Sequence, residues 1–384
     1  MKLIYICGGD VSVYESQVLE LLTYLQSHGI DVTLMQGYKH QAEMSALEAK
    51  MKKHDGVNVV WFKSKPVYGF MERSQERQIY RALTSIPDYS NAVVHVRSEY
   101  LGYIIKQIFI RYNIHLPLLI DIRGVVYEEL RYRIIHTAGI RKLLNRVQLR
   151  FYRHFYPKLF SKDSLPIALS SVSPLINAYI TNNYPECVYR KVFHPNIAGD
   201  KFVFTQEGRQ EIRKKYGFAE DELVVICSSN GGSVWQKDST IIGHLVKNGY
   251  KVINLSPNPL NMEGCITTLI PFTDMPKYLS AADIAILWRD DTFMNNSASP
   301  SKFSEFASMG LYVIHNRSVA VATDFIAKYN TGVLCNDPEA AIASIDIESV
   351  KTKRQKRCEI GQHTFSVQYL GQSYINTYHQ LCGK

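Results

Sequence analysis

Short apolar runs alternate with longer amphipathic stretches from the first residues onward, and this pattern predicts strands separated by helices. Residues 3–7 form an apolar run that ends at a glycine pair, and residues 30–35 form a second run. Between them, apolar residues recur at helical spacing from Val18 to Leu25, before Gly29. A strand, a helix and another strand in this order predict a β-α-β unit, whose strands are parallel.

The same alternation returns after Pro195 and predicts a second domain. A helix is expected at residues 301–309. A domain boundary is expected near residues 196–200, where Pro195, Gly199 and polar residues cluster. The strands that we expect are residues 3–7, 30–35, 57–61, 92–96, 118–122, 223–227, 251–255, 268–270, 284–287 and 311–315. The chain is therefore predicted to be an α/β protein with two doubly wound parallel sheets, which bind ligands at the carboxyl ends of their strands.

The composition agrees with this prediction and indicates the cellular compartment. A length of 384 residues, 46% of them hydrophobic and 21% charged, indicates a globular protein with more than one core. The seven cysteines form no C-x-x-C pair, which favours free thiols in a reducing compartment over a zinc site or a disulfide framework. The first apolar run is too short for a signal peptide, and no apolar stretch is long enough to span a bilayer. We expect a cytoplasmic protein with at most peripheral membrane contact.

The segment SPSKFSEFASMGLYVI, residues 299–314, carries the most informative side chains. Lys302 and Glu305 are three residues apart, so on a helix they share a face. Ser301 lies at the expected helix start, where free N–H groups and the helix dipole favour a diphosphate. A carboxylate one turn later, at Glu305, can accept hydrogen bonds from both hydroxyls of a ribose. The alternative is a capped surface helix with an ordinary ion pair.

This segment resembles the donor-site signature of glycosyltransferases with the GT-B fold, and of glycosyltransferase family 4 in particular. That family shows a Glu-x7-Glu motif, followed by a helix that ends in a small-residue turn and then by a strand. Glu305 matches the second glutamate, whereas Ser297 stands at the position of the first. Pro300, Lys302 and Glu305 also fit a Pro-x-Lys-x-x-Glu form that is common among bacterial polysaccharide-assembly transferases.

The resemblance covers nearly the whole chain. Residues 170–196 are similar to the end of the family's N-terminal domain, and the A-A-D segment at 281–283 matches one that precedes a strand in the family. The resemblance implies two Rossmann-like domains that face each other across a cleft. The acceptor-side domain would be residues 1–196 and the nucleotide-sugar-binding domain residues 197–365, with a C-terminal helix at 366–384 that crosses back. Gly8, Gly9 and Asp10 would lie on the acceptor side.

Further donor-site residues are expected after the first strand of the second domain. The loop SSNGGSVWQK, residues 228–237, contains Gly231 and Gly232, whose backbone N–H groups could approach phosphate oxygens. The resemblance implies basic residues in this region that neutralise the donor diphosphate, and we expect Lys237 and Arg289 to do so. Phe272, after a strand end, is a candidate for contact with the base. The alternative is a glycine turn with an exposed lysine.

Two strand ends of the first domain carry candidates for catalysis. Asp121 and Arg123 follow an apolar strand, and related transferases carry a similar segment that could orient the acceptor or the donor phosphate. His95 and Arg97 end the preceding strand. The alternatives are an internal Asp–Arg pair that fixes the turn and a histidine with a purely structural role.

Residues 131–162 form a basic segment with nine Lys or Arg and no Asp or Glu. One helical stripe in it is apolar and consists of Leu144, Val147, Phe151 and Phe155. Four arginines lie largely on other faces, namely Arg141, Arg146, Arg150 and Arg153. Such a helix can lie on an anionic membrane surface. A core-facing helix with a solvated basic face is the alternative, and nucleic-acid binding is disfavoured because no recognition motif accompanies the charge.

Together these features predict a glycosyltransferase that moves a sugar from a nucleotide-sugar donor to a glycan or lipid-linked glycan acceptor, in cell-surface polysaccharide synthesis. The resemblance implies retention of the anomeric configuration. Asp290 and Asp291 are adjacent and not spaced as a D-x-D metal motif requires, so we expect neither a metal nor another cofactor. A nucleotide-sugar epimerase of the same fold is one alternative. A binding subunit that has lost turnover is the other, and the departure at Ser297 permits it.

Overall fold

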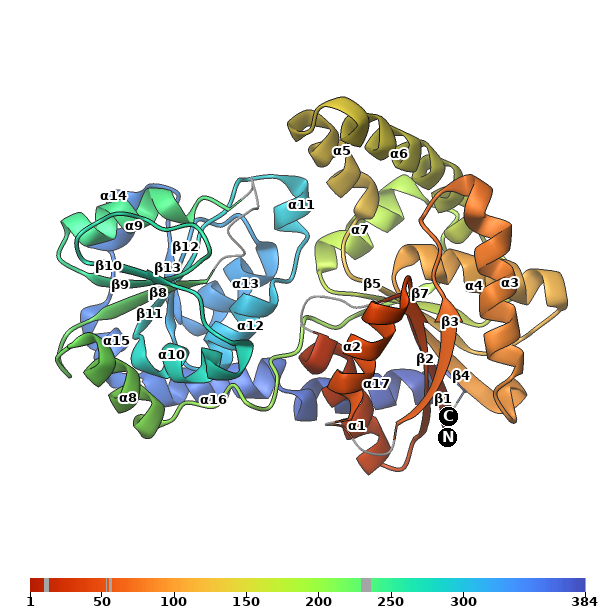
Figure 1. The fold of residues 1–384 in the computed structure, drawn as a ribbon, viewed down its shortest axis with the longest axis horizontal. Coiled ribbons are helices and arrows are strands. Elements are labelled where there is room, and N and C mark those ends of the chain that lie inside the picture. The colour runs from red at the N-terminus through yellow and green to blue at the C-terminus, as the bar shows by residue number, and fades with distance from the viewer. Residues whose placement is uncertain (10–13, 53, 55–56, 229–235, 384) are drawn as a thin grey trace. The chain divides into compact units, whose positions relative to one another are not determined.

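The structure is a computed structural model that describes residues 1–9, 14–52, 54, 57–228 and 236–383. The chain divides into two units, which are described separately (Figure 1). Unit 1 comprises Met1–Pro195 and Leu370–Lys384, and unit 2 comprises Asn196–Tyr369. Each unit contains one sheet, and all neighbouring strands in it pair in parallel. The prediction of two doubly wound parallel sheets is confirmed.

Unit 1 has a seven-stranded sheet with the order β3-β2-β1-β4-β5-β6-β7. The order reverses between β1 and β4, and open α/β sheets bind ligands at the carboxyl side of such a switch point. Its strands are β1 (Lys2–Cys7), β2 (Asp31–Tyr38), β3 (Asn58–Lys63), β4 (Ala92–Arg97), β5 (Leu118–Ile122), β6 (Ile167–Ser171) and β7 (Arg190–Phe193). Its helices are α1 (Glu20–Ser27), α2 (Gln41–Met51), α3 (Glu72–Thr84), α4 (Glu99–Tyr112), α5 (Val126–His136), α6 (Gly139–Leu159) and α7 (Pro174–Asn183). Shorter helical segments are η1 (Glu15–Leu19), η2 (Gly69–Met71) and η3 (Tyr89–Asn91).

Unit 2 has a six-stranded sheet with the order β10-β9-β8-β11-β12-β13, so its switch point lies between β8 and β11. Its strands are β8 (Val224–Ser228), β9 (Lys251–Leu255), β10 (Cys265–Thr268), β11 (Ile284–Leu287), β12 (Tyr312–His315) and β13 (Gly332–Leu334). Its helices before β12 are α8 (Gln206–Tyr216), α9 (Asp238–Lys247), η4 (Phe272–Asp274), α10 (Met275–Ala281), α11 (Phe293–Asn296) and α12 (Ser301–Ser308). Those after β12 are α13 (Ala320–Tyr329), α14 (Pro338–Ala343), α15 (Ile347–Thr352) and α16 (Arg354–Phe365).

The strands of unit 2 are apolar on both faces because both faces of the sheet are covered. In β8, Val224 and Ile226 belong to one buried cluster, whereas Val225 and Cys227 belong to another. Successive side chains of a strand point to opposite faces, so the two clusters lie on the two sides of the sheet. Parallel strands that are buried in this way read as near-continuous apolar runs, which is the pattern that the sequence shows.

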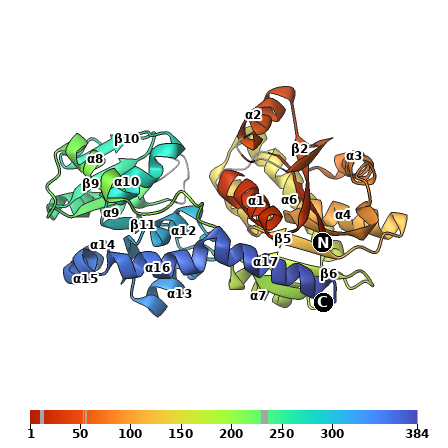
Figure 2. The same ribbon diagram turned by 90° about the horizontal axis from the view of Figure 1, so that it is seen from below.

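The last helix, α17 (Val367–Leu381), links the two units along the chain. Its residues from Leu370 onward belong to unit 1, and Figure 2 shows α17 beside α1. Gly371 of α17 lies against the ring of Tyr24. A Cβ atom at position 371 would clash with this ring, so glycine allows α17 to pack closely on α1. The prediction that a C-terminal helix returns to the first domain is confirmed.

Three strands are absent from the sequence prediction, and one prediction is displaced. The absent strands are β6, β7 and β13, and β10 precedes the residues 268–270 at which a strand was expected. All but β6 lie at the edge of a sheet. These edge strands have only three or four residues and pair on one side only, so their apolar signal is weak.

Candidate functional site

A buried carboxylate and a lysine form the centre of the candidate site in unit 2. They lie on α12, where Lys302 Nζ is 2.8 Å from Glu305 Oε2. Only 1% of Glu305 is exposed, and among the described residues its Oε1 atom has no hydrogen-bond partner. Burial raises the pKa of Glu305, while Lys302 and, more weakly, Lys201 act to lower it. An unsatisfied buried acceptor costs about 1–3 kcal/mol, so a ligand hydroxyl that donates to Oε1 would be stabilised there.

A second lysine and an aromatic ring lie beside this pair. Lys201 Nζ is 3.4 Å from the centre of the Phe272 ring, and Lys302 Nζ is 5.2 Å from the same centre. Lys201 also donates to the Phe272 carbonyl at 3.4 Å. The structure therefore brings Phe272, Lys302 and Glu305 together as the sequence suggested, and it adds Lys201. The sequence did not indicate Lys201, because this residue lies next to the domain boundary, far from the other residues along the chain.

The first turn of α12 is held in place by Asn196. The Asn196 N–H donates to Ser299 Oγ at 3.1 Å, and Ser304 Oγ donates to the Asn196 carbonyl at 2.7 Å. Pro300 occupies the N-cap position, and no side chain caps the helix. Ser301 is the first residue of the helix. The Phe303 N–H donates to the Pro300 carbonyl at 3.0 Å, whereas no described side chain caps the N–H groups of Ser301 and Lys302, which could bind an anion there.

Lys237 and Arg289 lie close together after β8 and β11. Lys237 donates its N–H to the Trp288 carbonyl at 3.1 Å, and its Nζ is 3.6 Å from Asp290 Oδ2. Asn316 pairs with the Arg289 backbone, accepting at 3.2 Å and donating at 2.6 Å. Burial lowers the pKa of Arg289. The structure thus brings the backbones of Lys237 and Arg289 together at the carboxyl ends of the strands. Gly231 and Gly232 lie outside the described residues.

A charged cluster lies at the carboxyl ends of β4, β5 and β6 in unit 1. Asp121 Oδ2 is 3.1 Å from Arg123 Nη1 and 3.8 Å from Arg97 Nη1. Ser170 Oγ donates to Asp121 Oδ1 at 2.9 Å, and Arg123 Nη2 donates to Gln17 Oε1 at 3.0 Å. Burial opposes ionisation of Asp121, but Arg123 and the other neighbours outweigh it and hold its pKa well below the usual range. Asp121 is therefore an anion that organises two arginines at the strand ends.

His95 is part of the same cluster but is fully buried. Its Nδ1 lies 2.7 Å from the Tyr378 hydroxyl of α17, and its Nε2 lies 3.9 Å from Asp121 Oδ2. Burial lowers the pKa of His95, so the neutral ring is favoured. In this arrangement no substrate atom can reach the ring. The structural alternative from the sequence analysis describes His95 better than a direct catalytic role does, whereas Arg123 and Arg97 remain partly exposed.

The acceptor-side glycines lie at the carboxyl end of β1. The Gly8 carbonyl accepts a hydrogen bond from Ser64 Oγ at 2.7 Å, and a Cβ atom at position 8 would approach Leu101 Cδ1 to 3.0 Å. A Cβ atom at Gly9 would meet Glu43 Oε1 at 3.2 Å. Because Gly8 and Gly9 have no side chains, the chain after β1 can pass close to Leu101 and Glu43. Asp10 lies outside the described residues.

Comparison with known proteins rests on structure alone, since no family sequence model and no curated protein matches the chain. The sucrose-phosphate synthase of Thermosynechococcus elongatus superposes with a TM-score of 0.68 at 12% identity, over 100% of this chain and 99% of that one. A glycosyltransferase from Rickettsia africae gives 0.69 at 14% identity, over 99% and 98%. Anabaena HepE, in complex with UDP and glucose, gives 0.66 at 12% identity, over 99% and 100%.

The chain has the GT-B fold. The match extends over both Rossmann-like units and the final helix, as the full coverage requires. It confirms the fold that the sequence resemblance implied. At these levels of identity the likeness concerns the fold, so membership of family 4 stays a prediction.

Ser297 of this GT-B chain stands where the glutamate motif of family 4 has its first glutamate. Ser297 is buried, and its Oγ donates to the Phe293 carbonyl at 2.8 Å. The short hydroxyl is thus used to close the turn after α11. Glu305 lies eight residues later and supplies the only carboxylate of the motif.

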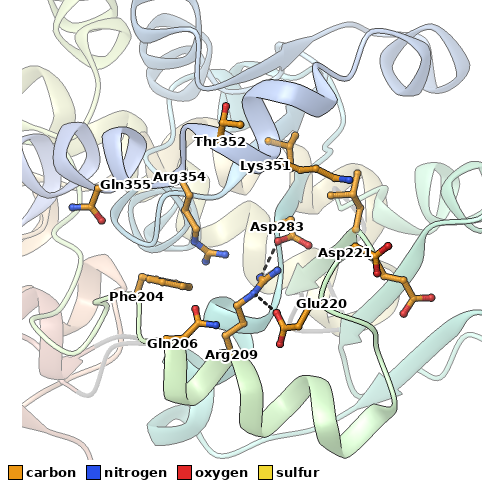
Figure 3. Close-up of a pocket in the computed structure, with 13 residues that line it drawn as sticks. Phe204, Gln206, Arg209, Glu220, Asp221, Asp283, Lys351, Thr352, Arg354 and Gln355 are labelled. Atoms are coloured by element: carbon orange, nitrogen blue, oxygen red, sulfur yellow. Dashed lines mark hydrogen bonds and ion pairs between the residues drawn. The ribbon is translucent and has the colours of Figure 1, made fainter.

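A hollow in unit 2 of the GT-B chain lies apart from the donor-side cluster. It has a volume of about 500 Å³ and is lined by residues that precede β8 and β11, so it lies at the amino ends of these strands (Figure 3). Arg209 in it pairs with Asp283 at 2.8 Å and with Glu220 at 3.5 Å. Its neighbour Arg354 donates to the carbonyls of Leu279, Ser280, Ala282 and Met309. These arginines join helix ends to the sheet and are already satisfied, which indicates a structural role.

No group of three or more His, Cys, Asp or Glu side chains is arranged to hold a metal ion within the part of the GT-B chain that the structure describes. No helix among the described residues combines the length and the apolarity that crossing a membrane requires.

Proposed function

We propose that the chain is a glycosyltransferase that moves a sugar from a nucleotide-sugar donor to a glycan or lipid-linked glycan acceptor. The observation that carries the proposal is the buried Glu305 Oε1, which has no hydrogen-bond partner among the described residues. It lies next to two lysines and to the start of α12, which no described side chain caps. This cluster lies at the carboxyl side of a parallel sheet, where open α/β domains bind ligands. Proteins that share the fold support the proposal, since HepE is described in complex with UDP-glucose.

In this proposal the donor is bound by unit 2. Glu305 accepts the ribose hydroxyls, and Phe272 lies near the base. Lys201, Lys302 and the N–H groups of Ser301 and its neighbours face the diphosphate, and Lys237 and Arg289 add charge. A departing diphosphate gains negative charge in the transition state, so cations fixed in advance lower the barrier to transfer. We propose that the transfer retains the anomeric configuration and needs no metal.

The acceptor is proposed to bind to unit 1, near the strand ends that carry Asp121 and Arg123. A role in cell-surface polysaccharide synthesis would suit the chain, because WaaG, a glycosyltransferase involved in lipopolysaccharide biosynthesis, has the same fold with a TM-score of 0.61. We propose that the chain acts in the cytoplasm at the inner face of the membrane, where a lipid-linked acceptor would be presented.

A binding subunit without turnover is the second candidate. The observation that favours it is Ser297, whose hydroxyl is bound to the Phe293 carbonyl and cannot take the place of a glutamate near the donor sugar. Such a protein would bind a nucleotide sugar but neither transfer nor hydrolyse it.

A thermal-shift series with UDP, GDP, ADP and CMP sugars tests the proposal, because a ligand that binds only the folded chain raises its Tm. We expect one base to give a clear shift, and transfer or slow hydrolysis of that sugar to follow in an activity assay. Binding without any turnover would support the second candidate. No shift with any nucleotide sugar would contradict both, and activity that EDTA abolishes would contradict the metal-free mechanism.

A further inference from the structure

The second half of the basic segment enters the core of unit 1, but its first half does not. On α6, Phe151 and Phe155 are 7% and 0% exposed, whereas Leu144 and Val147 on the same stripe are 43% and 44% exposed. The predicted stripe is therefore divided, and its C-terminal part packs against α4, where Phe155 stacks on Tyr103. From residue 131 to residue 150 no residue is buried, which makes this part of α5 and α6 a projecting hairpin tip (Figure 1).

The hairpin tip, residues 131–150, carries a continuous apolar face. Ile140, Leu143, Leu144 and Val147 follow the spacing i, i+3, i+4 and i+7, so they share one side of α6. Their exposed fractions run from 43% for Leu144 to 74% for Ile140. Ile135 of α5, which packs against α6, is 73% exposed. Single exposed apolar residues are ordinary, but a row of this kind marks an interaction surface.

The charges around this face are uniform in sign and largely uncompensated. Exposed arginines of α6 flank the apolar row, namely Arg141, Arg146, Arg150 and Arg153. Among the described residues none of these four forms an ion pair, whereas Arg131 and Arg133 of α5 pair with Glu128 and Glu129. The occupant of the face must therefore be both apolar and anionic.

We infer that the hairpin tip docks on a membrane surface that contains anionic lipid, with Ile140, Leu143 and Val147 entering the lipid boundary and the arginines binding headgroup phosphates. A basic helix with an apolar face binds such a surface by burying the face and by electrostatic attraction. A protein partner or a second copy would need a matching acidic apolar face. The inference deepens the proposed function by naming a partner, but it rests on exposed residues of α5 and α6 and not on the donor site.

The test is co-sedimentation of the full chain with two kinds of vesicle, one of phosphatidylcholine alone and one with added phosphatidylglycerol. We expect binding only to the anionic vesicles at low salt, and release at high salt because salt screens the attraction. Changing the four unpaired arginines to Gln should weaken binding at least about a hundredfold, since each charge contributes about fivefold. Changing Ile140, Leu143 and Val147 to Ser should weaken it at least about tenfold while leaving the charge unchanged.

Matched controls use exposed residues of the same kinds outside the hairpin tip. The basic control changes Lys39, Lys52, Arg77 and Arg81 to Gln, and the apolar control changes Ile110, Val188 and Val203 to Ser. Both should bind vesicles like the wild type, and all variants should keep the wild-type circular dichroism and Tm.

Three outcomes would overturn the inference. One is a wild-type chain that never binds anionic vesicles or binds neutral ones equally, and another is equal loss in the control variants. The third is self-association of the wild type without lipid that the Ser variant abolishes, since the face would then serve a second copy. Nucleotide-sugar binding, measured in parallel by thermal shift, should stay at the wild-type level in every variant. This parallel measurement distinguishes an error in the proposed donor site from an error in the proposed membrane surface.

Discussion

Lys302 neutralises one oxygen of Glu305 and leaves the other buried without a donor. The Nζ to Oε2 distance is 2.8 Å, while Oε1 has no hydrogen-bond partner among the described residues. A purely structural ion pair on a helix surface would leave its carboxylate in water, as Lys277 and Glu211 do in the same unit. A ligand that donates a hydrogen bond to Oε1 therefore explains the burial of Glu305 better than a contribution to folding stability does.

Replacing Glu305 should weaken nucleotide binding more than folding. Glu305→Ala removes the acceptor for the ribose hydroxyls, so we expect a loss of about 1–3 kcal/mol in binding free energy, measured by calorimetry with the nucleotide found in the thermal-shift series. Glu211→Ala, which breaks the exposed pair with Lys277, is the control and should bind normally. A folded Glu305→Ala variant with wild-type affinity would show that the ribose lies elsewhere.

The lysines that face the proposed diphosphate should matter for turnover. Lys302→Ala and Lys237→Ala remove charge that is needed most as the diphosphate departs, so each should lower kcat at least about tenfold with little change in Tm. Lys277→Ala removes an exposed lysine of the same unit and should leave kcat unchanged. If both variants keep wild-type rates, the diphosphate is not bound at these lysines.

Lys201 should contribute to donor binding although the sequence does not single it out. Its Nζ lies over the Phe272 ring and acts on the pKa of Glu305 from the boundary segment. We expect Lys201→Ala to weaken nucleotide binding by about 1 kcal/mol, and Lys201→Arg to keep much of the affinity because the charge and the ring contact persist. Equal affinities of the Ala and Arg variants would leave Lys201 with no part in the donor site.

Glu99 should make stability fall as pH rises toward alkaline values. The Tyr156 hydroxyl and the Val126 N–H donate to Glu99 Oε1 at 2.6 and 3.2 Å, which ties α5 and α6 to α4. Burial raises the pKa of Glu99 to about 8, above its ordinary value of 4.5. The folded state thus holds this proton more tightly than the unfolded state does. The resulting stability is complete below pH 4.5 and is lost as the pH rises through about 8.

Glu99→Gln tests this expectation by removing the titrating group while keeping an acceptor for both donors. Urea unfolding at a series of pH values should show a decline of the unfolding free energy between the two pKa values in the wild type and a flatter profile in the variant. Glu48→Gln, at a carboxylate whose residue is only partly buried, is a suitable control and should keep the wild-type slope. Identical slopes in the wild type and in Glu99→Gln would rule out Glu99 as the source.

Local pattern determined a large part of this protein. The apolar runs at Leu118–Ile122, Lys251–Leu255 and Ile284–Leu287 coincide with β5, β9 and β11, because a strand buried on both faces is mostly apolar. The spacing of Lys302 and Glu305 likewise placed them on one face of α12, as helical geometry requires. The edge strand β13 was not predicted, since its pairing with β12 defines it more than its own residues do.

Tertiary structure alone decided which of these side chains are buried and what surrounds them. Periodicity shows that Val147 and Phe155 lie on one stripe of α6, but only the position of α4 decides that Phe155 is covered and Val147 is not. Lys201 and Phe272 are far apart in sequence and meet because the boundary segment runs beside η4. His95 is removed from solvent by Tyr378 of α17, which folds back from the other end of the chain. Burial and long-range contact depend on the whole chain's path, whereas helical and strand periodicity depends only on neighbouring residues.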